Sequence, residues 1–150
     1  MSATLHALAE GAIAGGIATV PMSGAMGVAG TAGLMGRQPP ELIADAALTA
    51  AGALAPSREA EVAVAADAHL GFGMAMGALF AVLQRRLQPR TPPVLNGIGF
   101  GLAVWAVSYR GWVPALGIMP PPERDRPGRP ASMIAAHVVY GAALGAIVGR

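Results

Sequence analysis

The sequence predicts an all-α integral membrane protein, a four-helix bundle made of two similar helix pairs in a single domain over residues 1–150. Hydrophobic residues make up 54% of the chain and charged residues only 12%, about half the charged share of an ordinary soluble domain. Glycine is abundant, with 21 residues, as in helices that pack closely in lipid. Four segments also reach the length of about 20 residues that a helix needs to cross a bilayer.

The four predicted spans cover residues 10–36, 62–84, 93–119 and 130–149. Pro21 and Pro114 fall inside the first and third spans, so we expect kinks there. The Pro-rich loop PPPERDRPGRP before the fourth span predicts no regular structure.

A short amphipathic helix is predicted between the first two spans, from Glu41 to Ala53. It would lie at the membrane interface, or pack on the bundle as a connector. Its apolar face would hold Leu42, Ile43, Ala46, Ala47 and Ala50.

The orientation follows from the shortest loop, QRRLQPRTPP, which holds Arg85, Arg86 and Arg90 and no acid. By the positive-inside rule this loop is cytoplasmic, and both chain termini are then cytoplasmic as well. The positive charge of Arg150 at the C-terminus agrees with this orientation. The two outer connections also hold five arginines, so the bias is not one-sided. The expected location is a bacterial inner membrane, crossed several times, with the lipid bilayer as the main partner.

Several classes of function find no support in the sequence. Cysteine is absent, which removes disulfides and thiolate metal sites. No basic stripe with interleaved aromatic residues points to nucleic acid. There is no G-x-S-x-G setting for a serine nucleophile and no Walker-type phosphate loop, so an enzyme is not expected.

An internal repeat relates the second and fourth spans. HLGFGMAMGALFAV begins at His69 and HVVYGAALGAIVGR begins at His137, and both read H-x-x-aromatic-G-x-x-[M/L]-G-A-[L/I]. The first and third spans match more loosely, through EGAIAGG and NGIGFG. The G-x-x-x-G runs at Gly73–Gly77 and Gly141–Gly145 predict close helix crossings, either within one chain or between chains of a homo-oligomer or membrane complex.

The doubled His-x-x-aromatic helix, together with a third span that ends in SYRGWVPALGIMPPP, resembles the YagU-type family of small bacterial inner-membrane proteins. The resemblance covers residues 69–144. It implies a membrane fold and location, and it carries no catalytic residue.

A polar layer is predicted in the outer half of the bundle. Because the repeat places His69 and His137 at equal depth, and the third span brings Tyr109 and Arg110 near that depth, these residues could line one pocket. Ser108 adds a hydroxyl and Asp67 lies just above the layer. Alternatively, Arg110 extends to the lipid headgroups and each histidine makes one interhelical hydrogen bond.

This layer leaves several functions open. The leading hypothesis is a non-enzymatic binding protein or accessory subunit. The alternative is a small transporter or an electron carrier. In the electron carrier, His69 and His137 would ligate a metal, for example the iron of haem b, and Arg110 would pair with a haem propionate. Met22 and Met26, one helical turn apart, would suit Cu(I), or would simply fill the core.

Overall fold

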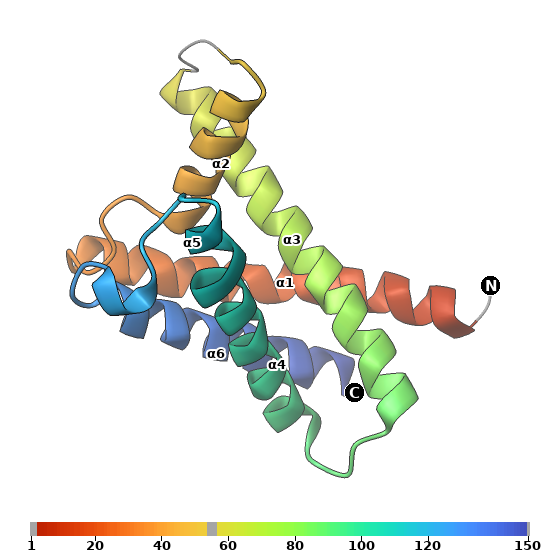
Figure 1. Ribbon diagram of the computed structural model, residues 1–150. Coiled ribbons are helices and arrows are strands. Elements are labelled where there is room, and N and C mark those ends of the chain that lie inside the picture. The colour runs from red at the N-terminus through yellow and green to blue at the C-terminus, as the bar shows by residue number, and fades with distance from the viewer. Residues whose placement is uncertain (1–2, 54–56, 150) are drawn as a thin grey trace.

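A computed structural model describes residues 3–53 and 57–149, and it is helical without strands over those ranges (Figure 1). Arg150, which the orientation argument used, lies outside the described residues. The helices in chain order are α1 (Ala3–Thr31), α2 (Pro39–Ala50), α3 (Arg58–Leu87), α4 (Pro93–Val107), the π-helix η1 (Ser108–Trp112), α5 (Val113–Ala115), the 3₁₀ turn η2 (Pro122–Arg124) and α6 (Arg129–Val148).

Three of the described helices, α1, α3 and α6, are long and apolar enough to cross a membrane. The predicted third span is divided instead. Its regular part, α4, has only 15 residues, and η1 and α5 continue the same path. The segment expected as the third span, residues 93–119, is thus helical up to Ala115 but divided into three consecutive helices.

The break in the third span lies at Gly111, not at Pro114. Gly111 has non-helical backbone angles, φ −103° and ψ −105°, and the turn around it widens into the π-helix. Pro114 sits near the start of α5, where its missing N–H costs little. In the first span, α1 continues through Pro21 as one helix.

The helices pair through glycines. On α1, a Cβ at Gly15 would meet the carbonyl oxygen of Gly73 on α3, and a Cβ at Gly77 would meet that of Gly11. On α4, a Cβ at Gly97 would meet the carbonyl oxygen of Gly141 on α6. The predicted close crossings at residues 73–77 and 141–145 therefore lie within one chain, between α1 and α3 and between α4 and α6.

One end of the helical assembly is tightly closed. Phe80 of α3 and Phe100 of α4 meet there with their ring centroids 5.2 Å apart, beside the fully buried Leu144. At the same end Arg85 donates to Glu10 at 2.9 Å, which joins the last turns of α3 to the first turns of α1. The cavity described below lies in the other half.

The connector α2 packs on α3, as Figure 1 shows. Its most buried residues are Pro39 and Ala44, whereas Ala47 and Ala50 are exposed, so the predicted apolar face is displaced. Arg37 ties the two helices together.

Arg37 pairs with Asp45 of α2 at 3.1 Å and with Glu61 of α3. The hydrogen bond with Glu61 raises the pKa of Arg37, against the opposing effect of desolvation. The charged guanidinium of Arg37 thus lies between acidic side chains of α2 and α3 and links the two helices.

Candidate functional site

A cavity of about 260 Å³ lies between α1, α2, α3, η1 and α6. Its wall is almost entirely apolar. His69, Tyr109 and His137, which the sequence placed in one layer, all line it, and so does Ser108. The structure thus brings three of the five predicted site residues to one space.

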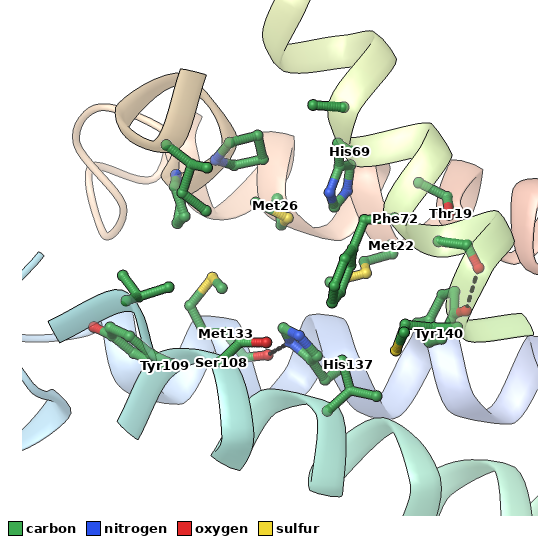
Figure 2. Close-up of a pocket in the computed structure, with 18 of the residues that line it drawn as sticks. Thr19, Met22, Met26, His69, Phe72, Ser108, Tyr109, Met133, His137 and Tyr140 are labelled. Carbon is green, nitrogen blue, oxygen red and sulfur yellow. Dashed lines mark hydrogen bonds between the residues drawn. The ribbon is translucent and has the colours of Figure 1, made fainter. Parts of the chain in front are cut away.

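His137 is buried, with 6% of its surface exposed, and its ring has a fixed polarity. Its Nδ1 lies 2.8 Å from the carbonyl oxygen of Met133, one turn earlier on α6. Since a carbonyl oxygen only accepts, Nδ1 must carry the proton, and Nε2 of the neutral ring then carries a lone pair. Figure 2 shows this hydrogen bond, with the ring at the wall of the cavity.

His69 reaches the same cavity from the opposite side. It descends from α3, whereas His137 rises from α6 (Figure 2). Its Nε2 is buried and has no hydrogen-bond partner among the described residues. A buried polar atom without a partner is costly, so an occupant that satisfied it would bind favourably.

Tyr109 contributes its ring to the cavity and its hydroxyl to a buried charge cluster. The hydroxyl donates to Asp125, whose carboxylate also pairs with Arg129 at 3.0 Å. Arg129 in turn donates through Nε to the carbonyl oxygen of Met35 at 2.8 Å. This cluster holds the loop before α6 against the segment after α1, so the Pro-rich loop is anchored and includes the turn η2.

Arg110 and Asp67 do not line the cavity. Arg110 is exposed and pairs at 2.6 Å with Glu123, which is exposed as well. The wide turn of η1 sends Ser108, Tyr109 and Trp112 inward and Arg110 outward. Asp67 is exposed on α3. Of the two arrangements that the sequence left open for Arg110, the one that puts it in the space of the histidines finds no support here.

Methionine supplies much of the apolar wall, a role that the sequence did not reveal. The lining methionines are Met22, Met26, Met76, Met119 and Met133. Flexible thioether side chains suit a cavity that must adapt to its occupant. The spacing of Met22 and Met26 hinted at a shared face of α1, but Met119 and Met133 arrive only through the fold.

The aromatic residues of the repeat have different roles. Phe72 lines the cavity and keeps 41% of its surface exposed. Tyr140 is buried and donates its hydroxyl to the carbonyl oxygen of Gly73 at 2.8 Å, which joins α6 to α3 (Figure 2). No local signal distinguishes these two positions.

The described residues contain no group of three or more histidine, aspartate or glutamate side chains placed to hold a metal ion. The two histidines and the methionine sulfurs are the soft donors that face the cavity. No acidic side chain lines it, so a hard cation such as Mg²⁺ would find no suitable ligands.

One family model matches residues 5–150, almost the whole chain, and it describes a family of unknown function, DUF6789. The chain belongs to DUF6789. No curated protein and no solved structure matches it. The DUF6789 match does not bear on the resemblance to the YagU-type family, which stays an expectation.

Proposed function

We propose that this DUF6789 chain is a membrane-spanning binding protein whose cavity takes a small, largely apolar molecule. The observation that carries the proposal is the cavity itself, because an apolar hollow with a few polar groups is the usual make-up of a small-molecule site. Here the polar groups include two imidazoles, and Nε2 of His69 has no hydrogen-bond partner among the described residues. The same site would also serve an accessory subunit of a larger membrane complex.

The proposed membrane arrangement has four spans, with α4, η1 and α5 forming the third. The equivalent glycine contacts of α1 with α3 and of α4 with α6 support an origin of the bundle in two similar helix pairs. If the protein lies in a bacterial inner membrane with both termini on the cytoplasmic side, the cavity would lie in the outer leaflet. The three arginines of the loop between α3 and α4 support this orientation.

The alternative is a haem-binding or metal-binding electron carrier, or a transporter. The shared position of His69 and His137 favours a bound cofactor, but Arg110 is paired outside the cavity and offers no partner for a propionate. A transporter needs a path across the bundle, and the packing of Phe80 against Phe100 closes the other half. We therefore keep the organic ligand as the main proposal.

Fluorescence of Trp112, which lines the cavity, tests whether a small apolar molecule binds there. Trp105 is replaced first, as Trp105→Phe, so that Trp112 is the only emitter. Bromobenzene is then titrated into the protein in lipid nanodiscs. We expect saturable quenching, because a bromine atom in the cavity would touch the indole.

A matched pair of variants on α3 locates the binding. Ala68 lines the cavity, so Ala68→Phe should fill it and remove the saturable phase. Ala63 is exposed five residues earlier and does not line this cavity, so Ala63→Phe should leave the phase intact. Quenching that stays linear with bromobenzene in every protein would contradict the proposal.

An absorption spectrum of the purified protein, with metal analysis of the same sample, separates the alternatives. A Soret band would support haem, and stoichiometric copper would support a thioether site. The organic-ligand proposal expects neither.

A further inference from the structure

We infer that the ligand of the cavity is a neutral, weakly polar molecule that donates a hydroxyl proton to Nε2 of His137 and enters from the bilayer. This inference rests on the proposed function, because it names the ligand class for the same cavity. It follows from which polar groups of the wall are still free to bind.

Three hydroxyl groups at the wall already donate to acceptors within the protein. The hydroxyl of Tyr109 donates to Asp125, that of Tyr140 donates to the carbonyl oxygen of Gly73, and that of Thr19 donates to the carbonyl oxygen of Gly15. The lining side chains with hydrogen-bonding capacity to spare are the two imidazoles, the hydroxyl of Ser108 and the indole N–H of Trp112.

His137 sets the polarity of the ligand. With Nδ1–H committed to the carbonyl oxygen of Met133, Nε2 can only accept a hydrogen bond. A ligand that presents a hydroxyl proton satisfies it, whereas an ether or an ester at the same place offers no proton. The ring of His69 lines the same space, and its buried Nε2 has no partner among the described residues, so a second polar atom of the ligand that reached it would satisfy it.

The wall also selects against charge. No Arg, Asp or Glu lines the cavity, so an ionised ligand would lose its hydration without gaining a counter-charge. Methionine, phenylalanine and tryptophan side chains would instead cover an apolar body. A phenol or an alcohol with a hydrophobic body has this combination.

The source of such a ligand is the lipid phase. α3 and α4 make few contacts with each other, and Phe72 of α3 lines the cavity while its side chain stays exposed. A hydrophobic alcohol or phenol partitions into a bilayer, so it can reach the cavity between these two helices without crossing water.

A matched set of brominated probes tests the ligand class in the protein that keeps Trp112 as its only tryptophan. We use para-bromophenol, which donates a hydrogen bond, and para-bromoanisole, whose methyl ether does not. Probe concentrations are expressed as the amount dissolved in the bilayer per lipid, so that the different partitioning of the two probes does not affect the comparison. We expect at least about tenfold tighter saturable quenching by the phenol, the preference given by one good hydrogen bond in an apolar site.

Three variants assign the acceptor. His137→Phe keeps an aromatic ring without a lone pair, and it should reduce the preference for the phenol to less than about threefold. His69→Phe should reduce it less. His6→Phe is the control, because His6 is exposed on α1 and pairs with Glu10 away from the cavity. If His137→Phe fails to fold, the comparison of phenol with anisole in the parent protein still tests the ligand class.

The outcomes separate this inference from the proposed function. Equal saturable binding of both probes would overturn the hydroxyl-donor ligand while binding in the cavity stood. A preference that survives His137→Phe and disappears in His69→Phe would overturn the assignment to His137. No saturable quenching by any probe would overturn the proposed function itself.

Discussion

At single positions, the backbone of one helix occupies the space that a side chain of its neighbour would need. Gly77 and Gly141 are such positions, since an added Cβ would meet the carbonyl oxygen of Gly11 or of Gly97. Backbone oxygens cannot rotate away as a flexible side chain can. Gly71 lies on α3 with Gly77, and Gly99 lies on α4, the helix that packs against α6; a Cβ at either position would meet nothing within 4 Å.

Gly77→Ala and Gly141→Ala should each lower the free energy of unfolding by about 1–3 kcal/mol, because the added methyl group forces the helix pair apart. Gly71→Ala and Gly99→Ala should leave it unchanged or raise it slightly, because alanine favours the helix. Reversible unfolding in mixed detergent micelles measures the difference. Equal effects at all four positions would show that the crossings are looser than described.

Arg110 of η1 and Arg129 at the start of α6 differ in burial by a wide margin. The side chain of Arg129 is 9% exposed and that of its partner Asp125 only 2%, whereas Arg110 and Glu123 are both more than half exposed. Removing one member of a buried pair leaves an unpaired charge, but an exposed charge is solvated by water.

Arg129→Gln should therefore destabilise the fold by about 3–5 kcal/mol. Arg110→Gln is the control, with an expected change of about 0–1 kcal/mol. Thermal unfolding followed by circular dichroism compares the two variants. A small effect of Arg129→Gln would mean that water reaches Asp125 and that the loop is not anchored by this pair.

At the scale of the elements, α2 and η1 complete a cavity to which the three long helices contribute most of the lining residues. Pro39, Pro40 and Ile43 of α2 form part of the wall, and the π-helix turns Ser108 and Trp112 towards it. A π-helix is uncommon and is found often at functional sites, because the wide turn redirects side chains. A regular helix through residues 93–119 would present a different set of residues.

The position of α2 should depend on Arg37, which connects it to Glu61 of α3. We expect Arg37→Ala to speed hydrogen exchange of the α2 amides about tenfold, because the helix loses its charged link and opens more often. Arg58→Ala is the control, since Arg58 is more exposed and makes one longer contact, 3.4 Å, with Glu41. Unchanged exchange in Arg37→Ala would show that apolar packing alone holds α2.

At the scale of the whole molecule, the closed end and the cavity end are expected to face opposite sides of the membrane. The loop after α3 carries the arginines that favour the cytoplasm, and α2 lies at the other end (Figure 1). An even number of spans brings both termini to one side.

Single-cysteine labelling can test this topology without background, because the chain contains no cysteine. Thr49→Cys on α2 should react with a membrane-impermeant maleimide in intact spheroplasts, whereas Thr91→Cys in the loop after α3 should react only after lysis. Both threonines are exposed, so access by the reagent depends on the membrane. The reverse labelling pattern would invert the orientation and place the cavity in the inner leaflet.

The sequence alone predicted the helical class, the small residues at the helix crossings and a common location for His69 and His137, which both line the cavity. These features are local or periodic, because helix periodicity and residue size act within a turn or two of the chain. The break at Gly111, the outward path of Arg110 and the buried partner of Tyr109 depended on the tertiary structure. A change of turn width rotates every later side chain about the helix axis, and the contact of Arg129 with Met35 joins residues far apart in the chain. Such contacts form only when the helices are packed, so no pattern within one segment predicts them.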